Sequence, residues 1–145
     1  MNLLSKGVLA SVLIVVVCPS YAEVVAVVGA KSPAAAMTKE QVAQIFLGKS
    51  SSMTPVDQAD GSAIRNEFYK KVADKEAAQA KALWSKLVFT GKASPPKEFP
   101  GSAEVKKALA TDVKAIGYIE KAEVDSTVKV VLATSNSNYG ELYRL

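Results

Sequence analysis

The amino-acid sequence predicts a single domain of the α/β class, in which strands and helices alternate along the chain. The run from Glu23 to Gly29, EVVAVVG, is rich in β-branched residues and is typical of a central strand covered on both faces. Apolar residues recur at helical spacing in the segments that follow. The composition agrees, because 49% of the 145 residues are apolar and 22% are charged, as in soluble globular domains.

Start and stop signals divide the next part of the chain into a helix and a strand. Thr38 and Gln41 form a capping box for a helix that is expected to end at Gly48. Residues 54–57 are expected to form a strand near an edge of the sheet, because Pro55 has no N–H to donate to a central ladder.

The following part is expected to contain three helices and two strands. Ser62 is the expected N-cap of the first helix, on which Arg65 is expected to face water. A second helix is expected over residues 76–89, and Ser102 is expected to cap the third. The strands are expected at 115–119 and 127–133. The expected core side chains include Phe46, Phe68, Ala80, Leu83, Trp84, Leu87 and Val88.

The first 22 residues have the pattern of a secretory signal peptide. Lys6 precedes an apolar run over residues 7–17, and the small-residue rule places cleavage after Ala22. This run is shorter than the roughly 20 residues that a membrane-spanning helix needs. We therefore expect a periplasmic protein with a removed signal peptide over 1–22, a folded domain over 23–133 and a loosely attached tail over 134–145.

The only cysteine of the chain, Cys18, lies inside this leader. It leaves a lipid anchor as the alternative to cleavage, although Val17 stands where lipoproteins have a small residue. Because the chain has no histidine and no further cysteine, Cys/His metal sites and Ser-His-Asp or Cys-His nucleophiles are excluded. We therefore expect no enzyme activity, no metal and no cofactor.

The net charge of +4 comes from lysines that are spread evenly along the chain, with only two arginines. Nucleic-acid-binding proteins concentrate their basic residues on one face or along one helix. A solvated surface explains the even spread better, so we expect no nucleic-acid partner.

The segment QADGSAI, residues 58–64, is the most informative for function. A strand that ends in a glycine turn and enters a helix leaves the first-turn N–H groups unpaired, and the helix dipole attracts an anion to that end. A bound oxyanion would contact Ser62 and its neighbours. The alternative reading is that Ser62 only caps its own helix, as most serines at such junctions do.

Four segments in this order resemble the periplasmic phosphate-binding proteins of phosphate ABC transporters: MTKEQVAQIFLGKS, VDQADGSAIRNEFYKKV, LWSKLVFTGKASPP and KAIGYIE. The resemblance covers nearly all of residues 24–131 and is greatest to a short branch that matches one lobe of the two-lobed proteins. It implies one half of the type II periplasmic binding protein fold, with a mixed sheet flanked by helices. It also implies phosphate or a similar oxyanion as the ligand.

In the long members of that family the segment matching QADGSAI reads R-x-D-G-S-G-T, in which the arginine and the turn hold the phosphate. By resemblance, the candidate ligand-binding residues are Asp60, Gly61, Ser62, Ala63, Ile64 and Arg65. Gln58 stands where the family has arginine, and the loss of a bidentate, charge-assisted contact weakens such a site. Arg65 could swing back to replace it, the alternative being a surface position.

Two classes of function remain open. The first is a secreted solute-binding-like protein for transport or sensing, whose partner is an ABC transporter membrane component or another envelope protein. The second is a ligand-free interaction or accessory module that keeps the fold, which the departures at Gln58 and Ile64 favour. A homodimer is one way in which a second subunit would cover Ser62 and strengthen binding.

Overall fold

The computed structural model describes Ile14 and residues 23–134. The expected signal peptide, apart from Ile14, and the tail from residue 135 lie outside these residues, so the expected domain boundaries stay predictions. None of the helices in the described part is long and apolar enough to cross a membrane.

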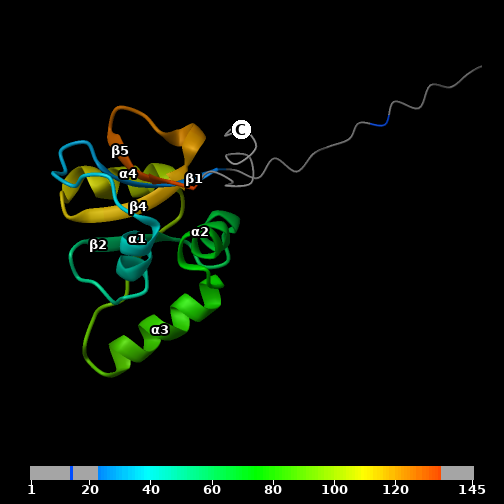
Figure 1. The fold of residues 1–145 in the computed structure, drawn as a ribbon, viewed down its shortest axis with the longest axis vertical. Coiled ribbons are helices and arrows are strands. Elements are labelled where there is room, and N and C mark those ends of the chain that lie inside the picture. The colour runs from blue at the N-terminus through cyan, green and yellow to red at the C-terminus, as the bar shows by residue number, and fades with distance from the viewer. Residues whose placement is uncertain (1–13, 15–22, 135–145) are drawn as a thin grey trace, which may run out of the picture.

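A five-stranded mixed sheet with four α-helices makes up the described part of the chain (Figure 1). In chain order the elements are β1 (Val24–Gly29), α1 (Lys39–Phe46), β2 (Thr54–Gln58), α2 (Ala63–Ala73), α3 (Ala77–Phe89), β3 (Lys97–Phe99), α4 (Ser102–Thr111), β4 (Ala115–Glu120), the 3-10 helix η1 (Lys121–Glu123) and β5 (Val128–Ala133). The strand order is β3-β2-β4-β1-β5. The expected α/β class with a mixed sheet flanked by helices is confirmed.

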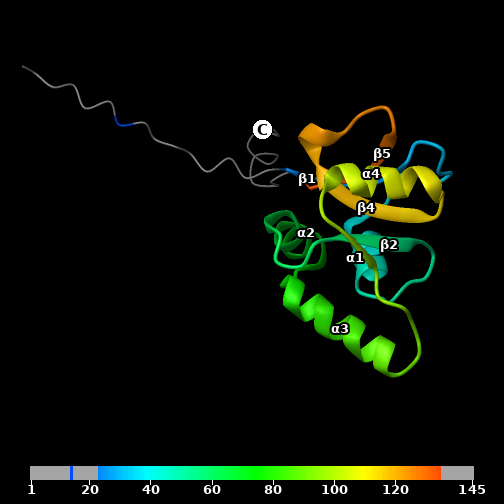
Figure 2. The ribbon, with the colours of Figure 1, turned by 180° about the vertical axis from the view of Figure 1, so that it is seen from behind.

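Strand β1 is an inner strand, as its apolar run predicts. It pairs antiparallel with β4 on one side and with β5 on the other, and all of its residues are buried. Val25 and Val27 face the layer formed by α4, which Figure 2 shows lying across the strands. Val24 and Val28 face the opposite layer, to which α1, α2 and the start of α3 contribute. Both faces of the sheet are therefore covered.

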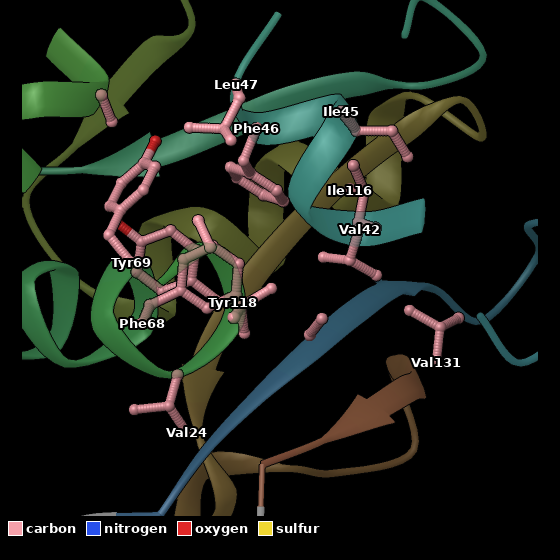
Figure 3. Close-up of a cluster of buried hydrophobic side chains, with 14 of the residues drawn as sticks. Val24, Val42, Ile45, Phe46, Leu47, Phe68, Tyr69, Ile116, Tyr118 and Val131 are labelled. Carbon is pink, nitrogen blue, oxygen red and sulfur yellow. The ribbon is translucent and has the colours of Figure 1, made fainter. Parts of the chain in front are cut away.

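Four aromatic side chains join α1 and α2 to β4 in the larger core cluster (Figure 3). The rings of Phe68 and Tyr118 are stacked with their centroids 4.0 Å apart. The Phe46 ring packs edge-on against Phe68, with the ring centroids 4.7 Å apart, and also packs edge-on against Tyr69. Such pairs add about 0.5–1.5 kcal/mol each to the free energy gained by burying the rings. They fix α2, and with it the turn that precedes α2, against the sheet.

The expected start and stop of α1 are confirmed. Thr38 and Gln41 form the capping box, and Gly48 follows the helix in the left-handed conformation with φ at 74°. A Cβ atom added to Gly48 would lie 2.3 Å from Cδ1 of Leu87 on α3. Glycine is therefore required here by backbone conformation and by the close approach of α3.

Strand β3, which occupies the edge beside β2, has no counterpart among the expected elements. Its residues lack the alternating apolar pattern of a strand, and two prolines precede it. Strand β2 runs parallel to both of its neighbours, and its pairing with β3 begins at Val56. Pro55 precedes that pairing, which explains how a proline is accommodated one strand away from the edge.

Helix α4 has Gly101 as its N-cap, so the expectation that Ser102 caps it is wrong. Ser102 is instead the first helical residue. A Cβ at position 101 would lie 3.3 Å from a carboxylate oxygen of Glu104, so glycine gives room for this acidic side chain in the first turn.

Helix α3 buries a narrower face than its sequence pattern predicts. Ala80 and Trp84 are buried, whereas Leu83 and Leu87 are only half-buried. Val88 is 43% exposed, so the expectation that it belongs to the core is wrong. Figures 1 and 2 show α3 extending beyond α2 and away from the sheet, and Val88 and Phe89 at its end are exposed.

Candidate functional site

The turn between β2 and α2 carries most of the candidate ligand-binding residues. Gly61 has φ at 79°, and a Cβ added there would meet no atom within 4 Å, so the outer side of the turn is open. Ser62 has extended backbone angles, and its Oγ accepts a hydrogen bond from the backbone N–H of Arg65 at 3.4 Å. Ser62 is therefore the N-cap of α2, as expected. The proton of its hydroxyl is a separate donor that this bond does not use.

The first-turn amides of α2 follow this cap. The backbone N–H groups of Ala63 and Ile64 have no acceptor among residues 23–134. Ala63 is exposed and Ile64 is half-buried, so the end of the helix reaches solvent. Unpaired first-turn N–H groups and the positive end of the helix dipole favour an anion at this place.

Asp60, at the start of the turn, pairs its carboxylate with the Nζ atom of Lys81 on α3. The hydrogen bond and the charge of Lys81 hold the pKa of Asp60 below its ordinary value. Both side chains are exposed. The pair neutralises the one acidic group of the turn, which would otherwise repel an anion.

Gln58, at the position of the family arginine, is buried at the end of β2. Its Nε2 donates to the backbone oxygen of Tyr118 at 2.9 Å, and its backbone N–H lies 3.1 Å from the Tyr118 hydroxyl. These bonds join β2 to β4. The side chain is therefore part of the sheet's internal hydrogen bonding and does not face the Ser62 turn.

Arg65 is only 4% exposed, so the expectation that it faces water is wrong. Its Nη1 donates to the backbone oxygen of Gln58 at 2.9 Å and to Oε1 of Glu98 at 2.8 Å. Its Nε lies 3.7 Å from Oδ1 of Asp57, which is an ion pair but too long for a hydrogen bond. A buried guanidinium needs such partners, and the two carboxylates come from β2 and β3.

Arg65 therefore reaches back toward Gln58, but to its backbone and not to the open turn. No contact of the Arg65 guanidinium with the turn supports the hypothesis that Arg65 replaces the missing arginine there. Five of the candidate residues, Asp60, Gly61, Ser62, Ala63 and Ile64, lie together on the turn and the first turn of α2. The guanidinium of the sixth, Arg65, contacts Gln58 on β2 and Glu98 on β3.

Asp57 is the buried acid that accompanies Arg65, and sequence reasoning missed it. Burial raises its pKa, while hydrogen bonds from the hydroxyls of Tyr118 and Tyr69 and the charge of Arg65 oppose the rise. Burial and the charge of Asp57 in turn raise the pKa of both tyrosines. The hydroxyls therefore stay protonated as donors. The signal in the sequence was an aspartate inside the expected strand at residues 54–57.

This cluster holds α2 to the sheet, because Tyr69 and Arg65 of α2 both contact Asp57 of β2. In the part of the chain that the structure describes, no group of three or more acidic, cysteine or histidine side chains is arranged to hold a metal ion. The chemistry available at the α2 turn is the donation of hydrogen bonds to an acceptor.

Comparison with solved structures gives the same fold in three proteins. A protein from Clostridium perfringens, assigned as a phosphate ABC transporter substrate-binding protein and solved with bound phosphate, is 23% identical, with a TM-score of 0.61 over 75% of this chain and 44% of its own. An ABC-type phosphate transport receptor from Vibrio cholerae is 18% identical, with a TM-score of 0.60 over 75% and 45%. PstS from Borrelia burgdorferi is 13% identical, with a TM-score of 0.57 over 81% and 48%.

The chain spans less than half the length of these three proteins. This likeness confirms the expected fold, which corresponds to about half of each of these longer proteins. No family model matches the chain, and no curated protein sequence matches it.

Proposed function

We propose that this chain, which has the fold of one lobe of phosphate-binding proteins, is a periplasmic solute-binding-like protein that takes phosphate or a similar oxyanion at the N-terminus of α2. The observation that carries the proposal is the open Asp60-Gly61-Ser62 turn, beside which the N–H groups of Ala63 and Ile64 are unpaired within the described residues. The Ser62 hydroxyl supplies a further donor. One protein with the same fold is solved with bound phosphate.

The proposed role is transport or sensing, without enzyme activity. An ABC transporter membrane component or another envelope protein is the proposed partner. A partner or a second copy of the chain that covered Ser62 would supply another wall to the site.

The expected affinity follows from the number of donors. A helix N-terminus in water gains about 0.3–1 kcal/mol from its dipole, and each charge-assisted hydrogen bond adds about 1.5–3 kcal/mol. Two or three such bonds, reduced by the entropy of association, give a dissociation constant on the order of a millimolar. A wall that excluded water would strengthen each bond.

A ligand-free interaction module is the second candidate, and the burial of Gln58 and its hydrogen bond to β4 favour it. The family arginine is replaced by a side chain that is buried and bonded to β4. The strongest donor of the family site is thereby absent from the turn. In this case the fold would serve contacts with another envelope protein, and no oxyanion would bind.

Calorimetry with phosphate and with sulfate separates the two candidates, and one variant tests the site directly. Ala63→Pro removes a proposed donor N–H, yet proline is favoured at the first helical position and Ser62 already has the extended backbone that precedes proline. The matched control is Ser102→Pro at the first position of α4.

Saturable phosphate binding that Ala63→Pro weakens several-fold and Ser102→Pro leaves unchanged is the result expected. Absence of phosphate and sulfate binding by the unmodified chain would reject the oxyanion site and favour the interaction module. Binding that is equal in both proline variants would place the ligand elsewhere.

A further inference from the structure

A pocket of about 410 Å³ lies between α3 and the segment that leads into β3. Figure 1 shows α3 projecting from the rest of the molecule and the chain returning from its end toward β3. The size is within the range of small-molecule sites, about 300–1,000 Å³. The lining residues include Arg65, Lys81, Trp84, Phe89, Pro95 and Glu98.

The polar part of this pocket is the guanidinium of Arg65, which has unused donors. A guanidinium carries five N–H donors in a fixed plane. Within the described part of the chain, the Arg65 side chain donates hydrogen bonds through Nη1 alone. Its Nε is buried and has no hydrogen-bond partner there. Buried donors without acceptors are rare and costly. An oxyanion placed in the pocket would supply acceptors.

Two carboxylates also line the pocket, and they differ in how firmly they are held. Asp57 is fully buried and accepts hydrogen bonds from Tyr69 and Tyr118, so it stays with the core. The Glu98 side chain is 46% exposed and belongs to the edge strand β3, which is three residues long. Glu98 is therefore able to turn into solvent and leave Nη1 of Arg65 to a ligand.

The other walls are apolar. Phe89 is 93% exposed at the end of α3, next to Val88, which is also exposed. The ring of Trp84 and the two prolines at 95 and 96 line the same space. Apolar side chains gathered beside a guanidinium form a site for a molecule with an apolar body and a charged head.

We propose that this pocket binds a small organic anion, with a carboxylate or phosphate monoester head on Arg65 and an aromatic or aliphatic body between Trp84, Phe89 and Pro95. The proposal does not rest on oxyanion binding at the α2 turn. The two sites share Lys81, whose Nζ pairs with Asp60, and they meet at Arg65, whose backbone N–H donates to Ser62 Oγ.

The pocket carries its own reporter, because Trp84 is the only tryptophan of the chain. Phenyl phosphate and benzoate are the probes, and phenol and inorganic phosphate at matched concentrations supply the body and the head separately. Saturable change of the Trp84 emission by phenyl phosphate or benzoate, at concentrations where phenol and inorganic phosphate have little effect, is expected. The better of the two probes identifies the preferred head.

Variants of exposed residues test the charge without endangering the fold. Phe89→Asp places a negative charge at the pocket and is expected to weaken binding of the better probe roughly tenfold, whereas the neutral Phe89→Asn should weaken it less. Glu98→Gln removes the competing carboxylate and is expected to tighten binding several-fold. Arg65→Lys should weaken it, with far-UV circular dichroism used to check that this buried variant folds.

Three results would overturn the proposal. Equal binding of phenol and phenyl phosphate would show that the head is not recognised. An equal effect of inorganic phosphate on Trp84 would show that the body is not recognised, and no change with any probe would show that the pocket stays empty. Phosphate binding at the α2 turn is measured separately by its sensitivity to Ala63→Pro, so either site can fail alone.

Discussion

Replacement of Trp84 by alanine tests how α3 is attached to the rest of the fold. The indole is 9% exposed, and its Nε1 donates to the backbone oxygen of Phe46 at 2.8 Å. Its ring also lies close to Gly48, at the end of α1. Burial of a tryptophan contributes about 3–5 kcal/mol relative to alanine, and the lost hydrogen bond accounts for about 1 kcal/mol of that range.

We expect the lower part of the range, about 3 kcal/mol, because one side of the ring borders the pocket beside α3 and is not fully enclosed. Urea unfolding followed by far-UV circular dichroism gives the change in free energy without relying on tryptophan emission. The melting temperature should fall by about 10 °C or more.

Phe89→Ala is the matched control, since it removes an aromatic ring from the same helix at a position that is 93% exposed. Its effect should stay within about 0.5 kcal/mol. A loss under about 1 kcal/mol for Trp84→Ala, or equal losses for the two variants, would refute the placement of α3 and the orientation of its buried face.

Three further changes follow from positions with well-defined surroundings. Gly48→Ala should cost about 1–2 kcal/mol in urea unfolding, because alanine disfavours the positive φ and its Cβ would meet Leu87. Gln58→Arg should lower the free energy of unfolding, because a second guanidinium would be buried near Arg65 in place of an amide that is bonded to β4. An unchanged melting temperature together with tighter phosphate binding would contradict this. The pKa of Asp57 is raised from 3.8, so the folded state holds this proton more tightly than the unfolded chain. Its contribution to stability is complete below 3.8 and is lost as the pH rises through the folded-state pKa, and Asp57→Asn should remove that slope when unfolding is measured across this range.

Local signals predicted the fold well. The β-branched run became an inner strand, and Thr38, Gly48 and Ser62 begin or end helices as expected, because caps and turns depend on residues close in sequence. Strand β3 escaped prediction because it is short and charged and is held in place by its pairing with β2, which lies far away in sequence.

The candidate site could be predicted only in part, for the same reason. The turn from Asp60 to Ser62 is local, and its open geometry followed from the sequence. The position of Arg65 did not, because helical periodicity assigns a charged residue to the water-facing side. Its partner Glu98 lies 33 residues further along the chain, and nothing in the local pattern indicates that pair. Buried charge pairs of this kind are properties of the assembled fold.

The position of β1 in the sheet has a consequence for the order in which the chain can fold. Val24 pairs with Glu120 on β4, and Val25 pairs with Ala133 on β5, so both neighbours of β1 come from the opposite end of the domain. During synthesis β1 is made before both of its partner strands, and about a hundred further residues must be added before it can pair with them. Pairing between segments so far apart in sequence slows folding. Until then the apolar residues of β1 have no neighbouring strand to pair with, so the segment can associate with copies of itself. We therefore expect the nascent chain, unlike the folded domain, to need protection of β1 against aggregation.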